Sequence, residues 1–343
     1  MTDGMTAGST RVAEWHGVTA AQFQQQIVPA GAPAVLRGAV GHWPAVAAGR
    51  SSPAAMANYL AAQSTGAPVH LMVGDASIGG HFFYNDTLTG FNYDNVSTPF
   101  RDVLELLLHS LEAATPQALY AGAVPIPAQL PGFGRDNALD ILNPAIEPKI
   151  WLSNRVTVQT HFDMSCNVAC VVAGRRRFTL IPPDQLENMY VGPLEFTLAG
   201  PPISMVKLDA PDFGKYPRFR SALAAAQVAD LEPGDALFIP YMWWHHVESL
   251  DRFNVLVNYW WDDLPAWQGS PFWALMHSIL SVRNLPPERR EIWQRVFNHF
   301  VFSGGDEALA HLTESQRGLQ GEPSPQKAQM IRSYIAQMLA GRR

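Results

Sequence analysis

The spacing of apolar residues shows that the first 115 residues mix helical and extended segments. The clearest helical pattern is STPFRDVLELLLHSLEAA (97–114), where apolar side chains recur at helical spacing behind Ser97 and Thr98. Residues 1–10 are expected to form a flexible tail. Further segments in this region predict two shorter helices, at 19–27 and 51–63, and two strands, at 32–38 and 118–126.

Between about residue 150 and residue 262, short β-prone runs alternate with turns. Many short strands at this spacing are typical of a β-sandwich or a β-barrel. The chain is therefore expected to be mainly β, with helices on either side of the β-rich region. The predicted strands are 155–162, 167–174, 176–183, 203–208, 227–235, 236–240 and 253–261.

The pattern becomes helical again after residue 270. Residues 287–302 and 324–339 predict helices, and Ile331, Ile335 and Leu339 form an apolar stripe on the second one. This stripe has two interpretations. It packs against the β-rich region of its own chain, or it pairs with a second subunit.

Composition is that of an ordinary globular protein, with 47% hydrophobic and 16% charged residues among 343. The net charge of −6 lacks the basic excess of a nucleic-acid-binding protein, so no nucleic-acid partner is expected. The N-terminus has no apolar signal-peptide core, and no apolar run reaches the ~18 residues of a transmembrane helix. Cys166 and Cys170 would lie too far apart on one strand for a disulfide. These features favour a cytoplasmic protein with reduced thiols and no membrane partner.

Two short motifs carry side chains that bind metals. In QTHFDMSCN (159–167), His161 and Asp163 are two positions apart, so on a strand they point to the same face. Two histidines and one carboxylate, with open positions opposite, form the metal site of non-haem Fe(II) oxygenases. The third ligand would come from the later segment WWHHVES, where His245 and His246 point to opposite faces of a regular strand. Either motif alone is common without a metal, but the pair predicts a metal site.

The segments around these motifs resemble a known family. HFD…N…GRRRFTLIPPDQ and PGDALFIPYMWWHHVES…NVLVNYWW are similar to the cupin-like branch of the JmjC superfamily of Fe(II)/2-oxoglutarate oxygenases, which includes an asparaginyl hydroxylase. The resemblance is most specific across about 150–262. It implies a double-stranded β-helix (cupin or jelly-roll) barrel, with N-terminal helices and strands outside it and a helical C-terminal region.

The resemblance also implies how the chain is divided. Residues 11–262 would form one cupin-like JmjC oxygenase domain, with its barrel core at about 115–262. The helical region at 263–343 would form a homodimer, because the related hydroxylase dimerises through its C-terminal helices.

By resemblance, His161, Asp163 and His245 are the Fe(II) ligands. His245 is favoured over His246 because the family's ligand directly follows an aromatic residue. His246 is then a buried polar residue behind the site. Trp260 matches an aromatic residue near the substrate entrance, and core packing is its alternative role.

The resemblance further assigns residues to the cosubstrate, 2-oxoglutarate. Arg176 stands where the family has a lysine that holds the distal carboxylate, and an arginine can bind a carboxylate with two parallel hydrogen bonds. Tyr120 matches a tyrosine that touches the same carboxylate, although a half-buried strand tyrosine is an equal alternative. Asn167 and Asn258 match asparagines that line the cosubstrate pocket.

One hydroxyl group of the family is missing from this sequence. The family has a hydroxyl donor three residues before the first histidine ligand, and Val158 stands there. Either Thr157 or Thr160 would have to replace it, and the sequence does not distinguish the two.

The implied activity is hydroxylation of a C–H bond, coupled to conversion of 2-oxoglutarate into succinate and CO2. No motif identifies the substrate: the resemblance favours a protein or peptide side chain, and a small molecule remains open. A histone demethylase is less favoured, because no zinc or reader module accompanies the motifs. Two other functions remain: a cupin metalloenzyme that does not use 2-oxoglutarate, and a metal-binding scaffold protein without turnover.

Overall fold

The computed structural model describes residues 10–198, 200–303 and 309–341. The chain divides into two compact units, one ending at Trp261 and the other beginning at Asp262. The expected tail lies outside the described residues except for Thr10, which begins a strand.

The first unit contains all the strands that the structure describes. They are β1 (Thr10–Arg11), β2 (Ala13–His16), β3 (Ala34–Arg37), β4 (Pro68–Gly74), β5 (His81–Phe82), β6 (Tyr93–Pro99), β7 (Ala118–Pro125), β8 (Pro148–Ser153), β9 (Thr157–Phe162), β10 (Cys166–Ala173), β11 (Arg176–Ile181), β12 (Gln227–Leu231), β13 (Ala236–Ile239), β14 (Trp244–Ser249) and β15 (Asn254–Trp261). Its helices are α1 (Ala20–Gln22), α2 (Pro44–Ser51), α3 (Pro53–Gln63), α4 (Phe100–Ser110), α5 (Ile126–Gln129), α6 (Phe133–Asp136) and α7 (Phe219–Ala224), with the helical turns η1 (Phe23–Ile27), η2 (Ala76–Ile78) and η3 (Pro183–Asn188).

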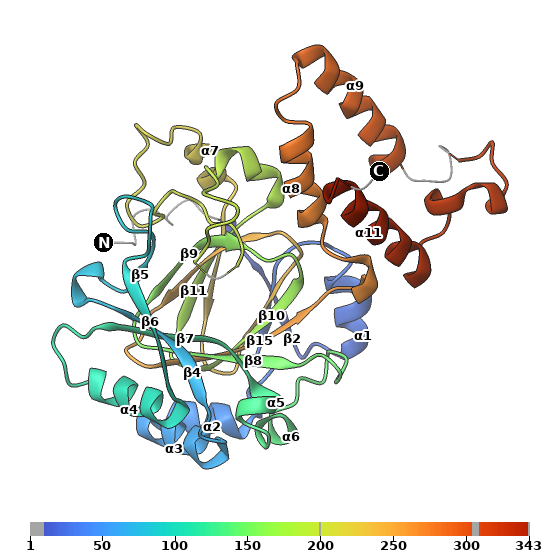
Figure 1. Cartoon of the computed structure of the whole chain (residues 1–343). Coiled ribbons are helices and arrows are strands. Elements are labelled where there is room, and N and C mark those ends of the chain that lie inside the picture. Colours follow the sequence, from blue (N-terminus) through green and yellow to red (C-terminus); the bar gives the residue numbers. More distant parts are fainter. Residues whose placement is uncertain (1–9, 199, 304–308, 342–343) are drawn as a thin grey trace. The chain divides into compact units, whose positions relative to one another are not determined.

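The strands form two sheets that face each other (Figure 1). The order is β1-β12-β11-β14-β9-β5 in the smaller sheet and β2-β3-β13-β10-β15-β8-β7-β4-β6 in the larger. Along the chain, β8 to β15 switch sheets at every step except from β11 to β12, which are adjacent in the smaller sheet, and the pairs that these strands form with one another are antiparallel. This arrangement is a jelly-roll barrel, so the predicted fold class is confirmed.

Successive side chains along a strand of the larger sheet point to opposite faces and so contribute to two separate apolar cores. In β10, Ala169 and Val171 face the interior between the sheets, whereas Val168, Cys170 and Val172 face the helices outside the larger sheet. Helices α2 to α6 cover that outer face (Figure 1). Each fully buried valine contributes about 1.5–3 kcal/mol through loss of water-exposed surface. Both faces of the larger sheet are therefore held by apolar packing, which makes it a firm wall for the barrel cavity.

Most predicted elements are present, and two details of the predictions are wrong. Residues 203–208 form no strand but only isolated bridges from Ile203 and Ser204, since the carbonyl oxygen of Ser204 accepts from the Gln159 side chain. The helix expected at 97–114 is shorter: Ser97 and Thr98 belong to strand β6, and α4 spans only Phe100–Ser110. The two cysteines are free, as expected.

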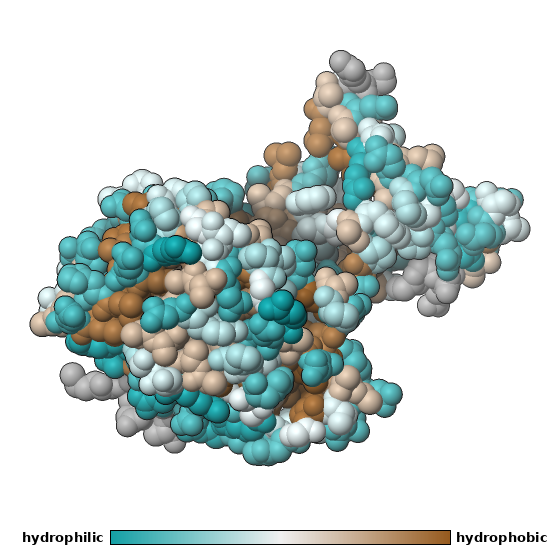
Figure 2. Space-filling model, turned by 90° about the horizontal axis from the view of Figure 1, so that it is seen from below, coloured by the Kyte–Doolittle hydropathy of each residue, from teal (hydrophilic) through white to brown (hydrophobic). Residues whose placement is uncertain are grey.

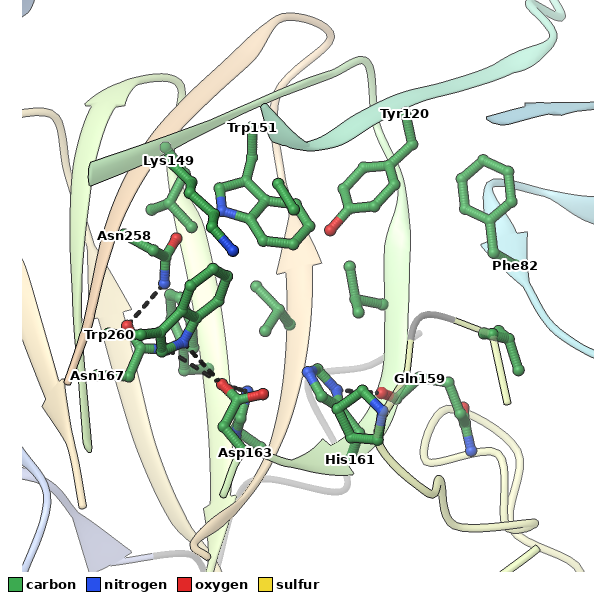
Figure 3. A pocket seen from close by; sticks show the side chains of 18 of the residues that line it. Phe82, Tyr120, Lys149, Trp151, Gln159, His161, Asp163, Asn167, Asn258 and Trp260 are labelled. Carbon is green, nitrogen blue, oxygen red and sulfur yellow. Dashed lines mark hydrogen bonds and ion pairs between the residues drawn. The ribbon is translucent and has the colours of Figure 1, made fainter. Parts of the chain in front are cut away.

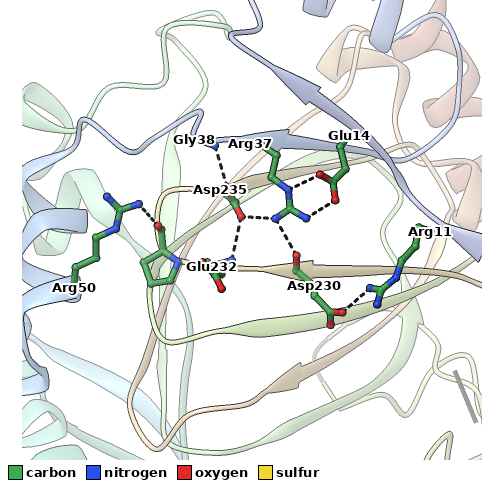
Figure 4. A network of polar contacts seen from close by, with 9 residues as sticks. Arg11, Glu14, Arg37, Gly38, Arg50, Asp230, Glu232 and Asp235 are labelled. Atoms are coloured by element: carbon green, nitrogen blue, oxygen red, sulfur yellow. Dashed lines mark hydrogen bonds and ion pairs between the residues drawn. The ribbon is translucent and has the colours of Figure 1, made fainter. Parts of the chain in front are cut away.

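An ion-pair network ties the N-terminal strands to the barrel (Figure 4). The Arg37 guanidinium on β3 donates to both carboxylate oxygens of Glu14 (2.6 and 3.0 Å) and to Asp235 (2.6 Å). It also donates to the backbone oxygen of Asp230 at 3.0 Å. Hydrogen bonding to Glu14 raises the pKa of Arg37 and lowers that of Glu14. One arginine thus connects β2, β3 and the turn between β12 and β13.

The second unit is helical and has little core of its own. It contains α8 (Pro271–Ser281), α9 (Pro287–Phe297) and α11 (Pro325–Leu339), with the helical turns η4 (Ala266–Gln268), η5 (Asn298–Phe302), η6 (Glu314–Gln316) and η7 (Gly318–Gln320). Among its described residues only Leu309 is buried, and apolar side chains stand at its surface (Figure 2). None of the helices in the described ranges is long and apolar enough to cross a bilayer.

Candidate metal centre and cavity

The three predicted ligands come together at one end of the smaller sheet. One ligand atom from each of His161, Asp163 and His245 lies within 4.8 Å of the others. His161 on β9 is paired directly with His245 on β14, and their ring centroids are 4.2 Å apart. His245 Nε2 is 3.6 Å from Asp163 Oδ2. The structure therefore brings together the residues that the sequence motifs predict.

Backbone carbonyls orient both histidine rings. Nδ1 of His161 lies 2.8 Å from the carbonyl oxygen of Gln159, and Nδ1 of His245 lies 3.0 Å from that of Trp243. A carbonyl can only accept, so each Nδ1 carries the hydrogen and each Nε2 presents its lone pair. Burial, and then the nearby His161, lower the pKa of His245 to about 4. His245 is thus neutral at neutral pH, the form that binds a metal.

Asp163 lies just after the end of β9 and is fixed by three contacts. Its backbone oxygen accepts from the N–H of Met242, at 3.0 Å, in the turn that precedes β14. Its Oδ2 accepts from Trp260 Nε1 at 3.0 Å and from Asn167 Nδ2 at 3.4 Å (Figure 3). Such outer contacts set the orientation of a metal-binding carboxylate. Trp260 therefore holds a predicted ligand, a contact beyond its expected place near the substrate entrance.

His246 points away from the cavity. Its Nδ1 lies 3.2 Å from the hydroxyl of Thr160, and it is absent from the cavity wall that His245 helps to form. Burial lowers the pKa of His246 to about 3, so it is a neutral buried residue behind the site. The choice of His245 over His246 follows from the alternation of strand β14.

The metal centre opens into a cavity of about 430 Å³ between the two sheets. The volume is in the range of small-molecule sites. All eight candidate site residues line it (Figure 3 labels six of them). The wall consists of Met72, Phe82, Tyr120, Ala123, Lys149, Trp151, Val158, Gln159, His161, Asp163, Met164, Ser165, Asn167, Arg176, Phe178, Leu198, Pro201, His245, Val247, Leu256, Asn258 and Trp260.

Arg176 is a buried charge without an ion-pair partner among the described residues. It is 1% exposed, and its Nε and Nη2 have no hydrogen-bond partner. Burial lowers its pKa to about 10, although Tyr120 acts in the opposite direction. Gly174, at φ +72°, makes the turn before Arg176, and a Cβ there would come 2.3 Å from Asn254 Oδ1. The chain thus holds a buried guanidinium with two unpartnered donor nitrogens, which a bound anion would satisfy.

The remaining predicted cosubstrate residues also face the cavity. The Tyr120 side chain is buried with its hydroxyl directed into the cavity (Figure 3), and burial raises its pKa. Asn258 donates to Asn167 Oδ1 at 2.8 Å, while its own Oδ1 is buried without a partner. These groups offer polar contacts to a bound ligand, as the resemblance predicts.

The structure gives no replacement for the missing hydroxyl. Val158 lines the cavity, whereas neither Thr157 nor Thr160 does. The hydroxyl of Thr160 is engaged with His246. Neither of the two candidate threonines therefore faces the cavity.

Sequence reasoning missed two groups of residues that shape the cavity. Lys149 and Trp151 lie two positions apart on β8 and both face inward. A loop further along the chain contributes Leu198 and Pro201. Tyr93 donates to the backbone oxygen of Leu198 at 3.2 Å and so holds this loop. The two-residue spacing of Lys149 and Trp151 could have indicated that both side chains lie on one face of a strand, whereas no sequence pattern indicated that Leu198 and Pro201 would reach the cavity.

A family model described as "Cupin-like domain" matches residues 20–266, more than half of the chain. The chain belongs to the cupin-like domain family.

Relatives of this cupin-like domain carry several different names. It is 34% identical over 134 residues to "Lysine-specific demethylase JMJ31" of Arabidopsis thaliana, which is 39% of this chain and 23% of the relative. It is 40% identical over 107 residues to "tRNA wybutosine-synthesizing protein 5" of Gallus gallus, 31% of this chain and 30% of the relative. It is 33% identical over 116 residues to human "HSPB1-associated protein 1", 33% of this chain and 23% of the relative. The matches thus span less than a third of each relative's length.

The family match and these relatives identify a JmjC-type cupin oxygenase fold, as the sequence motifs indicated. The donor set of this cupin-like domain fits the metal that such proteins generally use. Two imidazoles and a carboxylate on one side, with an open cavity on the other, match the non-haem Fe(II) site. The unsatisfied guanidinium of Arg176 fits a carboxylate of 2-oxoglutarate.

Proposed function

We propose that this protein is an Fe(II)- and 2-oxoglutarate-dependent oxygenase that hydroxylates a C–H bond of its substrate. The observation that carries the proposal is the buried, unpaired Arg176 in the same cavity as the triad. A metal site alone would suit any cupin metalloenzyme. A buried cation that lacks a counterion adds the need for an anionic ligand beside the metal.

His161, Asp163 and His245 would hold the Fe(II) on one side and leave its other positions open to the cavity. With 2-oxoglutarate and O2, the bound iron supplies the oxidising chemistry, which releases succinate and CO2. The protein's own groups position the reactants. Arg176 would bind the distal carboxylate through two N–H groups, and Tyr120 would donate its hydroxyl to the same end.

Other residues keep the ligand geometry fixed. Trp260 and Asn167 hold the Asp163 carboxylate, so its orientation is set before the metal binds. Leu198 and Pro201 add apolar surface to the cavity wall, which limits the access of water.

The direct test is succinate formation from 2-oxoglutarate in the presence of Fe(II) and O2. We expect wild-type protein to form succinate slowly even without its prime substrate, and Asp163→Ala to abolish this. Asp184→Ala, at an exposed position outside the cavity, is the matched control. A cupin metalloenzyme of another class, or a scaffold protein, would form no succinate above a metal-free blank.

For the prime substrate, we propose a chemical class and not an individual molecule. The names of the relatives refer to a lysine demethylase, a tRNA-modifying protein and a protein associated with another protein. We favour a protein or peptide side chain, with a small molecule as the second choice. The tRNA relative means that the comparisons do not support the expected absence of a nucleic-acid partner.

We also infer that the C-terminal unit forms a homodimer. Its helices leave large apolar side chains exposed, including Trp273 (66%), Leu280 (74%) and Leu339 (64%). A groove of the same unit is lined by Trp273, Phe300, Ile331 and Ile335. Exposed apolar surface of this kind is typical of an interaction site. Two copies of α11 would bury the stripe that the sequence shows.

A further inference from the structure

Lys149 is a second cation in the cavity, and its charge is unmatched. Its side chain is half-buried on β8, and its Nζ lies 5.0 Å from the centre of the Trp260 ring. Among the residues that the structure describes, no carboxylate forms an ion pair with it. Neither the metal ligands nor the proposed cosubstrate contacts account for this lysine.

The strand pairing gathers further polar groups around Lys149. Asn258 on β15 lies directly opposite Lys149 on β8, so the two side chains are neighbours on the inner face. Trp151 is two positions along β8 and shares that face, and its ring centroid is 5.6 Å from that of Trp260. Figure 3 shows the ammonium of Lys149 and the indole nitrogen of Trp151 directed toward the same part of the cavity.

Two of these neighbours carry buried polar atoms without partners. The indole N–H of Trp151 and Oδ1 of Asn258 make no hydrogen bond. Buried polar atoms in folded proteins are nearly always paired, so this cluster is arranged for a ligand. The Lys149 ammonium and the Trp151 indole N–H are both donors, which selects for an acceptor with negative charge, whereas Oδ1 of Asn258 is itself an acceptor and does not contribute to this preference.

The charge balance of the cavity supports the same conclusion. Its charged wall residues are Asp163, Lys149 and Arg176. A divalent metal (+2) and the dianionic cosubstrate (−2) cancel each other, and Asp163 (−1) cancels one of the two cations. One positive charge then remains, and because Arg176 pairs with the cosubstrate, it is the charge of Lys149. An anionic group of the prime substrate would neutralise it in a partly desolvated site, where charge pairing is strong.

We infer that Lys149 and Trp151 form a subsite for a carboxylate of the prime substrate, of the size of an Asp or Glu side chain. This inference rests on the proposed function for the location of the cosubstrate. Trp260 contacts Lys149 through its ring and Asp163 through its N–H. Trp260 therefore stands between Lys149 and the metal ligand Asp163, and a carboxylate bound at Lys149 would be separated from the metal ligands by this one side chain. Lys149 is a specificity-determining residue in this arrangement.

The test is calorimetric binding to the full chain loaded with Zn(II), which supports no turnover, and 2-oxoglutarate. The probes are blocked aspartate and glutamate, compared with blocked asparagine and glutamine of the same shape. In wild-type protein we expect each acid to bind about tenfold more tightly than its amide. Lys149→Met should remove this preference and Lys149→Arg should restore most of it. Lys215→Met is the matched control, because Lys215 makes the same contact with a ring (5.1 Å) outside the cavity.

The outcomes separate this subsite from the cosubstrate site. Equal binding of acid and amide by wild-type protein, or binding of neither, would overturn the inference. So would a loss of 2-oxoglutarate affinity in Lys149→Met as large as that in Arg176→Met, because Lys149 would then hold the cosubstrate. Stronger competition by inorganic phosphate than by acetate would point to a phosphate ester and overturn the carboxylate. Failure of the proposed oxygenase activity would leave the acid preference measurable, since no step of the assay requires turnover.

Discussion

Replacing Arg176 with methionine should increase stability and decrease cosubstrate affinity, two effects of opposite sign. The side chain is 1% exposed and lacks an ion-pair partner among the described residues, and burial lowers its pKa to about 10, well below the ordinary value of an arginine. Because one pKa unit corresponds to about 1.4 kcal/mol, this shift reflects a cost of roughly 3 kcal/mol for the buried charge. Methionine removes the charge and retains an apolar chain that fills much of the same space. We expect the ligand-free variant to be more stable by about 1–3 kcal/mol.

The same substitution removes the proposed contact with 2-oxoglutarate. Two charge-assisted hydrogen bonds, each worth about 1.5–3 kcal/mol, would be lost, which corresponds to at least a hundredfold weaker binding. Calorimetry on the Zn(II) form measures the affinity, and thermal unfolding of the ligand-free protein measures the stability. Arg176→Lys tests the residue that the family uses and should retain part of the affinity.

Arg175 provides a matched control for this experiment. It is the adjacent residue, its side chain is 57% exposed, and it pairs with Asp251 at 2.8 Å. Arg175→Met should change the stability by less than about 1 kcal/mol and leave the affinity unaltered. The reasoning is refuted if Arg176→Met destabilises the ligand-free protein while 2-oxoglutarate binds as before, because Arg176 would then be a structural residue.

Two further predictions concern the framework around the site. Arg37→Met should lower the free energy of unfolding by about 2 kcal/mol, since it removes four hydrogen bonds that join β2, β3 and the β12–β13 turn. Chemical denaturation measures this, and Arg135→Met, which breaks an exposed pair with Asp136, should show no measurable change; equal effects would contradict the role given to the network. Ile335→Glu in the full chain should convert a dimer into a monomer in light scattering, because Ile335 lines the apolar groove. Gln337→Glu adds the same charge to an exposed position outside that groove and should leave the dimer intact, and a dimer that survives Ile335→Glu would place the interface elsewhere.

The metal ligands were predictable because their chemistry is local. His161 and Asp163 are two positions apart, and the pairing of β9 with β14 adds His245 from a motif that is equally distinct. Strand alternation only placed His245 and His246 on opposite faces, and the choice of His245 came from the resemblance, in which the ligand directly follows an aromatic residue. The alternation of short strands and turns predicted a sandwich or a barrel, and the family resemblance around the motifs was needed to choose the barrel.

The rest of the site depends on contacts between segments that are distant in the sequence. Lys149 gains its position from the pairing of β8 with β15, which no local pattern reveals. The segment 203–208 looks like a strand, but the Gln159 amide donates to the backbone oxygens of Ser204 and Val206, at 2.7 and 2.8 Å, and diverts it into a loop. Tertiary hydrogen bonds therefore outweighed the β propensity of this segment.

The most direct test of the central claim is an anaerobic titration of the protein with Fe(II), in the presence and absence of 2-oxoglutarate, followed by visible absorption. If the triad holds the metal and Arg176 helps to hold the cosubstrate beside it, a metal-to-ligand charge-transfer band should appear only when both are present. The band should be absent in Asp163→Ala and should require far more 2-oxoglutarate in Arg176→Met. A wild-type protein that binds Fe(II) but develops no such band at saturating 2-oxoglutarate would contradict the proposed function.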